Sequence, residues 1–239
     1  MLHPRITADW EGKPCIVMAS GPSLTPEVAR KVRFVRWLEG WKVIVVNDAY
    51  KMLPRADILY ACDERWWDLH QGAKEFEGER WSSHNASPRV KDEKIVCAER
   101  FGLNLVLAED GEGFSFNQSF IRYGGSSGGQ AINLALLKGC RRIVLVGFDQ
   151  RLVSGKSHFF GSHPEPLHDM QDDDFRGSLL DFKYAAQSLP ADVSIVNATP
   201  GSALTIFPMM EFDEATRWDD RLHRHRAEPE CRAHRDCTA

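Results

Sequence analysis

The sequence has no apolar run long enough to cross a membrane and no strong excess of charge of either sign. A membrane-spanning helix needs about 20 consecutive apolar residues, and the mean hydropathy of the 239-residue chain is −0.37. The formal net charge of −4 argues against a duplex nucleic-acid binder, which usually presents a basic face. Residues 1–12 also lack the apolar core of a signal peptide. These absences predict a cytoplasmic globular protein with no membrane span.

Cysteine is present, but without the spacing of a secreted disulfide scaffold. A free thiol in or beside an apolar strand behaves as a small hydrophobic group, and four of the cysteines occupy such positions. Scattered thiols of this kind indicate a reducing compartment. The six cysteines are Cys15, Cys62, Cys97, Cys140, Cys231 and Cys237.

The glycine-rich run over 124–129 matches neither of the common nucleotide-binding patterns. It is not a GxGxxG sequence, and no Gly-Lys-Ser/Thr follows it. The run precedes a predicted helix over 130–138, so Ser127 and Gly128 could present backbone amides to an anion. The alternative is a flexible loop that ends in a helix cap.

Apolar runs alternate with amphipathic segments along the chain, which predicts an α/β fold with a mostly parallel sheet. Thr25 and Pro26 predict the start of the first helix, with Val28, Val32 and Leu38 among its core-facing residues. The pattern indicates one Rossmann-like domain over 1–215. Strands are expected at 15–19, 42–46, 57–61, 94–98, 103–108, 142–146 and 193–196, with further helices at 130–138 and 175–189.

Two segments depart from this alternation. Residues 150–172 form a long polar loop rich in His, Gly and Pro, and loops of this length in compact domains are usually lids or disordered. Residues 216–239 are charged and aperiodic, which predicts a disordered tail that is dispensable for folding. His223, His225 and Cys231 in this tail form no tight zinc-ligand pair with its other His and Cys residues, so no metal site is predicted.

Small and polar residues follow nearly every predicted strand. In open parallel sheets, ligands bind outside the carboxyl ends of the strands, where small residues and helix N-termini can approach a phosphate. One such loop alone would indicate only turn chemistry, but several at one edge predict a nucleotide site. The candidates are Ser20, Gly21, Pro22, Ser23, Asn47, Asp63, Ser127, Gly128, Gly147, Asp149 and Ser202.

Other polar or aromatic clusters have a simpler interpretation. Asp172, Asp173 and Asp174 resemble a metal site, but they directly precede a predicted helix, where carboxylates stabilise the N-terminus. Trp66 and Trp67 could stack on a base or a sugar, although burial in the core is the commoner outcome.

The ordered set of loop motifs resembles a known superfamily. Ser20-Gly21-Pro22-Ser23-Leu24, Asn47, Asp63, Ser127-Gly128, Gly147-Phe148-Asp149, Ser157 to His163 and Pro200-Gly201-Ser202 occur in that order. In this arrangement the chain resembles the bacterial lipooligosaccharide sialyltransferases and the related 6-hydroxymethylpterin diphosphokinases. It is most similar to uncharacterised bacteriophage proteins of the same type. The resemblance extends over about residues 13–210.

The resemblance implies specific roles for the loops. In the sialyltransferases the matching loops bind the cytidine nucleotide of the donor sugar, and a histidine of the lid is the general base. Carried over, the base is His163, but its alignment needs a one-residue insertion, which leaves His158 as the alternative. The tyrosines that follow the Gly-x-Asp motif in that family are replaced here by Gln150 and Arg151.

The resulting hypothesis is a nucleotide-dependent glycosyltransferase that uses a CMP-sugar type of donor and an acceptor hydroxyl, without a required cofactor. The first alternative is a diphosphokinase-like enzyme, in which Asp48, Asp63 and Asp149 would hold Mg²⁺ and ATP. The second is a nucleotide-binding module without catalysis. The donor sugar, the acceptor and the oligomeric state, for which a homo-oligomer is one candidate, stay open.

Overall fold

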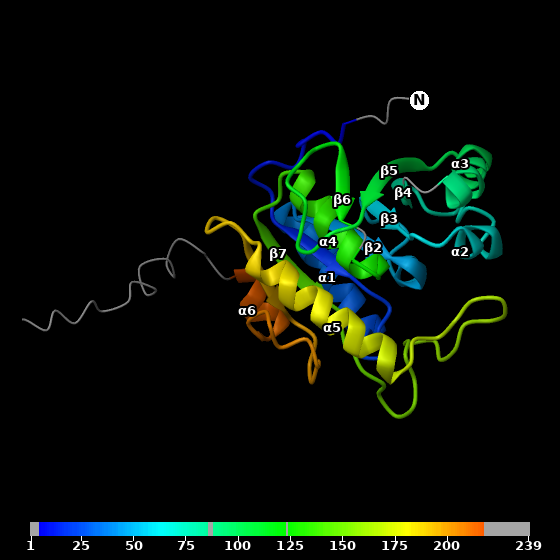
Figure 1. Ribbon diagram of the computed structural model, residues 1–239. Helices are drawn as coiled ribbons and strands as arrows, with labels where there is room; N and C mark the ends of the chain where they lie inside the picture. The colour runs from blue at the N-terminus through cyan, green and yellow to red at the C-terminus, as the bar shows by residue number, and fades with distance from the viewer. Residues whose placement is uncertain (1–4, 86–87, 123, 218–239) are drawn as a thin grey trace, which may run out of the picture.

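The centre of the protein is one sheet of eight strands, all parallel, in the order β6-β5-β4-β3-β2-β1-β7-β8. The structure is a computed structural model that describes residues 5–85, 88–122 and 124–217 (Figure 1). The predicted α/β fold with a parallel sheet is confirmed. The strands are β1 (Cys15–Met18), β2 (Lys42–Val46), β3 (Ile58–Tyr60), β4 (Glu79–Asn85), β5 (Asn104–Glu109), β6 (Phe120–Arg122), β7 (Arg142–Val146) and β8 (Ser194–Asn197).

The order of the strands creates a switch point between β1 and β7. From β1 the chain adds strands outward to β6, and it then returns through a helix to place β7 on the other side of β1. Met18 at the end of β1 pairs with Val146 at the end of β7, so both strands finish at the same level. A crevice opens at the carboxyl ends of two such strands because their connections leave in opposite directions.

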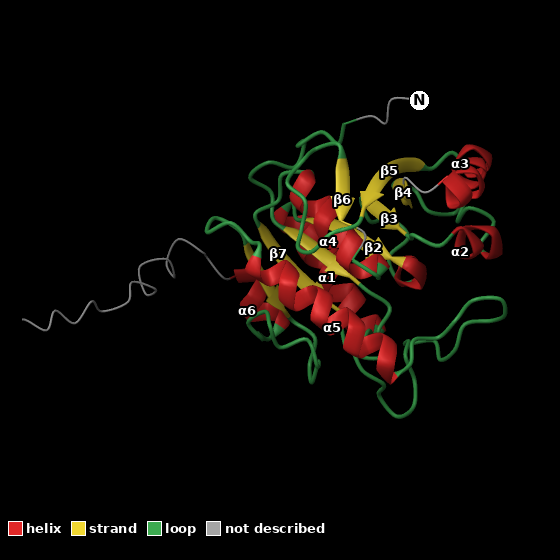
Figure 2. Cartoon of the chain, viewed as in Figure 1, coloured by secondary structure: helices red, strands yellow, loops and turns green. Residues whose placement is uncertain are grey.

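Helices cover both faces of the sheet, and the strand residues alternate between the two cores. Cys15 and Val17 face the core beneath α4 and α5, whereas Ile16 and Met18 face the core beneath α1, α2, α3 and α6. Figures 1 and 2 show α4 and α5 crossing the front of the sheet. The helices are α1 (Pro26–Glu39), α2 (Glu64–Leu69), α3 (Pro88–Phe101), α4 (Ser127–Leu137), α5 (Asp172–Gln187) and α6 (Phe212–Arg217), with the short 3₁₀ helix η1 (Asn47–Lys51) after β2.

The predicted start of α1 is confirmed. Thr25 is the N-cap, and its hydroxyl accepts a hydrogen bond from the Val28 amide, with Pro26 in the first turn. Ala29, Val32 and Val35 form the buried face, but Leu38 is 53% exposed, so its assignment to the core is wrong.

The edge of the sheet beyond β3 differs most from the prediction. The expected strand over 94–98 is wrong, because these residues lie in α3, where Cys97 and Ala98 are buried and Val96 is exposed at helical spacing. Strands β4 and β6 were not predicted. Ser83 and His84 of β4 are buried although they are polar, so this strand lacks the apolar run that marks a buried strand.

The loop between β7 and α5 contains no helix or strand, as the sequence predicts. It runs from Gly147 to Gln171 and projects past the N-terminal end of α5 (Figure 2). The cap interpretation of 172–174 is confirmed, because Asp174 and Gln171 form a capping box at the start of α5. At the C-terminus α6 includes Thr216 and Arg217, two residues past the expected domain boundary. The other residues of the expected tail, 218–239, lie outside the described residues.

Two further sequence interpretations can be compared with the structure. Trp66 and Trp67 are both buried, as expected for core residues, with their rings packed edge to face. None of the described helices combines the length and the apolar character that crossing a membrane requires.

The carboxylate of Asp57 ties the start of β3 to α1 and β2. It accepts hydrogen bonds from the Arg36 guanidinium at 2.9 Å and from the Val43 amide at 2.9 Å, and Lys42 lies 3.4 Å away. Burial alone would raise the pKa of Asp57, but the Arg36 and Val43 donors hold it below its usual range.

We expect Asp57→Asn to lower the free energy of unfolding by about 2 kcal/mol at neutral pH, because a charged acceptor with three donors is lost. A carboxyl whose pKa is lowered in the folded state stabilises the protein above its unfolded pKa, and this contribution disappears as pH falls through the folded pKa. Urea unfolding at several pH values should therefore show the variant and the parent converging in acid. Asp68→Asn, in an exposed pair with Arg100, is the matched control and should change stability little.

Candidate functional site

The loops that follow β1, β2, β3 and β7 surround a cleft at the switch point, together with the first turn of α4. A cavity of about 530 Å³ lies on the β3 side of this cleft, and a smaller one of about 100 Å³ lies between the β1 and β7 loops. Both cavities are lined by Asn47, Ser126, Ser127 and Met170, so they form one continuous depression. Of the predicted nucleotide-binding residues, those that line it are Ser20, Gly21, Asn47, Asp63, Ser127, Gly128, Gly147 and Asp149.

The β1 and β7 loops are clamped to each other. The Gly21 amide donates to the Gly147 carbonyl at 2.9 Å, and Asp149 accepts hydrogen bonds from the amide and the hydroxyl of Ser23. A side chain at Gly21 would collide with the Asp149 carboxylate and the Gly147 carbonyl. Burial raises the pKa of Asp149, and the Ser23 donors oppose this shift.

This clamp changes the expected role of residues 20–23. Their small side chains were expected to leave backbone amides free for a phosphate, but the amides of Gly21 and Ser23 are already bonded within the protein. Pro22 has no amide hydrogen, and neither Pro22 nor Ser23 lines the cavities. The loop shapes one wall of the cleft, and its anion-binding position is filled by the carboxylate of Asp149.

The first turn of α4 presents two unpaired amides to the cleft. Ser126 is the N-cap, and its hydroxyl accepts from the Gly129 amide, which leaves the amides of Ser127 and Gly128 at the helix terminus. Within the described part of the chain, neither amide has a hydrogen-bond acceptor. Both residues line the cleft, so this end of the helix can receive an anion. Gly128 is required by space, since a side chain there would meet the Phe148 ring.

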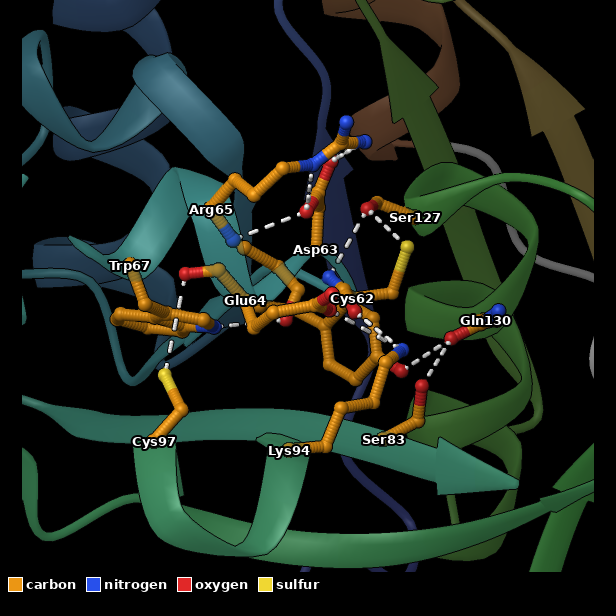
Figure 3. A network of polar contacts seen from close by, with 12 residues as sticks. Cys62, Asp63, Glu64, Arg65, Trp67, Ser83, Lys94, Cys97, Ser127 and Gln130 are labelled. Carbon is orange, nitrogen blue, oxygen red and sulfur yellow. Dashed lines mark hydrogen bonds and ion pairs between the residues drawn. The ribbon is translucent and has the colours of Figure 1, made fainter. Parts of the chain in front are cut away.

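A network of polar contacts fixes the β3 side of the cleft to α4 (Figure 3). The Ser127 hydroxyl accepts from the Cys62 amide at 3.1 Å and lies 3.1 Å from the Cys62 thiol. The buried Lys94 ammonium donates to the Cys62 carbonyl at 2.7 Å. Asp63 caps α2 and pairs with the Arg65 guanidinium at 2.8 Å, at the rim of the larger cavity.

Asn47 and Asp48 follow β2 but have different surroundings. Asn47 has a positive φ of 49°, a conformation that asparagine tolerates well, and it lines both cavities. Asp48 is buried away from the cavities, where it accepts hydrogen bonds from Lys51 and from the Trp66 indole. Burial alone would raise the pKa of Asp48, but contacts with His70, Lys51 and Trp66 hold it well below its usual range.

Ser202 does not reach the cleft. Its hydroxyl donates to the Phe148 carbonyl at 2.5 Å and accepts from the Leu204 amide at 3.0 Å. Thr199 accepts from the Phe148 amide at 3.0 Å. The turn after β8 is therefore hydrogen-bonded to the β7 loop. The geometry gives no support to the predicted contact of Ser202 with a nucleotide, because Ser202 does not line the cleft.

The loop after β7 places both candidate bases over the cleft. His163 lines the larger cavity and His158 the smaller one, and their ring centroids are 4.4 Å apart. Asp169 lies beside both, because it accepts from the His163 amide at 2.9 Å and lies 3.5 Å from Nδ1 of His158. The Phe159 amide donates to the Ser20 carbonyl, which anchors the loop to the β1 turn.

Burial decides the protonation of the two imidazoles. Burial lowers the pKa of His158 to about 4, and the charge interaction with the neighbouring His163 adds a smaller shift in the same direction. Desolvation also lowers the pKa of His163, although the nearby Asp48 and Asp169 oppose this shift. Both rings are therefore neutral at neutral pH.

Several residues of the site were not identified from the sequence. Asp169 stands six residues after His163 in a polar loop, and only that spacing could have indicated its place beside the histidines. Ser126, Met170 and Asp181 also line the cleft, but they belong to no motif that the sequence displays.

The fold is a doubly wound α/β domain with a cleft at its switch point. No protein-family model and no curated protein matches the sequence. Among solved structures, the MAf glycosyltransferase from Magnetospirillum magneticum AMB-1 is similar, with a TM-score of 0.56 and 13% sequence identity. The match covers 90% of this chain and 35% of that chain, so this chain corresponds to about a third of the neighbour. At this identity the similarity shows a shared fold.

We expect Gly21→Ala to lower the free energy of unfolding by about 1–3 kcal/mol, because the added methyl group forces Asp149 or Gly147 away from the β1 loop. Thermal and urea unfolding measure this effect. Gly177→Ala is the matched control, since nothing lies within 4 Å of a methyl group at that helical position. Equal stability of the two variants would contradict the clamp.

Proposed function

We propose that this chain is a nucleotide-dependent glycosyltransferase that moves a sugar from a nucleotide-activated donor, of the CMP-sugar type, to an acceptor hydroxyl. The observation that carries the proposal is the unpaired N-terminus of α4, which lines both cavities of the cleft beneath a histidine-bearing loop. The likeness in fold to a glycosyltransferase supports the reaction class.

The donor phosphate is assigned to the amides of Ser127 and Gly128. A helix N-terminus attracts an anion through its free amides and its dipole. The Ser126 cap and the Cys62 contact of Ser127 fix this turn before a ligand arrives, so little ordering is required on binding.

The nucleoside is assigned to the larger cavity on the β3 side. Asn47 offers an amide to ribose hydroxyls or a base edge, and Asp63 lines the same cavity with Arg65. The smaller cavity between Gly21, Gly147 and Asp149 would hold the part of the donor that lies beyond the phosphate.

The carboxylates favour this assignment over a diphosphokinase that holds Mg²⁺ and ATP. Each of the three candidate ligands is already bonded to protein donors: Asp48 to Lys51 and Trp66, Asp63 to Arg65, and Asp149 to Ser23. Over residues 5–85, 88–122 and 124–217, they do not converge as a cluster of metal ligands. These carboxylates stabilise the fold and the loops through their protein partners.

Ser127→Pro tests the phosphate assignment. Proline removes the amide donor but suits the first helical position, and Ser126 before it is already extended, with φ −143° and ψ 144°. We expect about a tenfold loss of CMP affinity by calorimetry, as for a lost charge-assisted hydrogen bond. Ser127→Ala, which removes the same hydroxyl and keeps the amide, should bind CMP more tightly than Ser127→Pro. Equal affinities would remove the α4 terminus from the binding site.

His163 is the proposed base on the acceptor hydroxyl, because the family resemblance assigns the role to it and its ring lies 4.4 Å from that of His158, which lines the smaller cavity assigned to the donor sugar. His163→Ala should keep CMP binding and lose turnover by about a hundredfold or more, the usual contribution of a positioned base. Full turnover in His163→Ala with none in His158→Ala would transfer the role to His158. Full turnover in both variants would refute a base on this loop.

A nucleotide screen separates this proposal from the alternatives. Calorimetry with CMP, CDP and ATP, each with and without magnesium, should show tight cytidine binding that needs no metal. ATP binding that depends on magnesium would indicate the diphosphokinase instead. Nucleotide binding with no transfer from any sugar donor would indicate a binding module.

A further inference from the structure

We propose that His158, His163 and Asp169 form a binding site for a divalent transition-metal ion, with zinc as the best-suited ion. Each residue offers one ligand atom, and these three atoms lie within 4.8 Å of one another. Two imidazole nitrogens and one carboxylate oxygen are a ligand set that zinc binds in proteins, usually at about 2.0–2.2 Å. Magnesium prefers oxygen ligands alone, so this set discriminates against it.

The spacing of the ligand atoms is close to that of a tetrahedral site. Bonds of about 2.1 Å place neighbouring ligand atoms about 3.4 Å apart in a tetrahedron. Nδ1 of His158 and Oδ1 of Asp169 are already separated by 3.5 Å. The two imidazoles meet at an interplanar angle of 63° and are therefore not stacked, so a small ring rotation could direct one nitrogen of each toward a common centre.

The surroundings hold these side chains in place. Asp169 accepts a hydrogen bond from the His163 amide, which fixes the backbone between two of the ligands. The Phe160 ring packs against both imidazoles, with centroid separations of 5.0 Å and 4.9 Å. Contacts of this kind around first ligands orient them and strengthen metal binding.

Three protein ligands leave a fourth position, and here that position faces the cleft. His163 lines the larger cavity and His158 the smaller one, so an ion between them would lie at their junction. Zinc sites with three protein ligands keep the fourth position for water or a substrate atom. A water molecule or a phosphate oxygen of the nucleotide could occupy it.

The consequence for activity rests on the proposed function. An imidazole nitrogen that binds a metal cannot also accept a proton from an acceptor hydroxyl. Zinc would therefore inhibit a transferase whose base is His163, and it would fix residues 158–169 over the cleft. The assigned phosphate position at Ser127 and Gly128 lies on α4 and stays available to the nucleotide.

Titration of the full chain with Co²⁺ and Zn²⁺ tests the site independently of catalysis. We expect one equivalent of Co²⁺ to bind with a visible absorption spectrum of nitrogen and oxygen ligation, and Zn²⁺ to displace it. Asp169→Asn and His163→Ala should each weaken the affinity about tenfold or more. His168→Ala is the matched control on the same loop, since this exposed side chain pairs with Asp174 and should leave the affinity unchanged.

The tail contains Cys231 and Cys237 as well as histidines, so it needs its own control. The variant Cys231→Ser/Cys237→Ser should retain the Co²⁺ spectrum, whereas a sulfur-to-cobalt charge-transfer band that this variant loses would place the ion in the tail. No binding, or binding insensitive to His163→Ala, overturns the proposed site. CMP binding that persists without metal binding would reject the metal site and leave the proposed function intact.

Discussion

The β1 and β7 loops are joined at the switch point by a small set of hydrogen bonds, and the geometry of the whole cleft depends on them. Gly21 lies against the Gly147 carbonyl, Asp149 holds both donors of Ser23, and the Ser20 carbonyl receives the Phe159 amide. Through that last contact the clamp also fixes the beginning of the histidine-bearing loop. The Asp149 carboxylate fills the position that an anionic ligand would otherwise take, so the proposed phosphate site lies elsewhere in the cleft.

The proposed phosphate site is the N-terminus of α4, and the topology explains why this helix end reaches the cleft. The chain must cross from β6 back to β7, and α4 makes this crossing, so its first turn reaches the cleft that the switch point opens. Ser126 caps one amide, and the Cys62 contact of Ser127 orients the turn. The cleft thus combines a well-fixed helix N-terminus with a loop that carries two imidazoles.

The sequence was sufficient to predict the central strands but not the outer ones. Lys42–Val46 and Arg142–Val146 are buried on both faces and read as continuous apolar runs, so both were predicted with their exact bounds. Polar residues of β4 are buried through partners on other elements, as Ser83 is by Gln130, and a single sequence does not show such pairing. Residues 94–98 of α3 were mistaken for a strand, because a short apolar run such as Ile95-Val96-Cys97 is compatible with either structure.

In the candidate site, too, local sequence features could be predicted, whereas contacts between residues far apart in the sequence could not. The loops at the strand ends could be predicted because parallel strands bring their carboxyl ends together. The hydrogen bonds between Ser23 and Asp149 could not be predicted, because they join residues 126 positions apart in the sequence. For the same reason the sequence left His158 and His163 as alternatives, whereas the structure places them together with Asp169.

A crystal structure of the protein with bound CMP tests the central claim most directly. The account predicts that a phosphate oxygen lies within hydrogen-bonding distance, about 3 Å, of the Gly128 amide, with the cytidine in the cavity beside Asn47 and Asp63. A phosphate bound at residues 20–23 with Asp149 displaced, or a nucleotide bound outside this cleft, would contradict it.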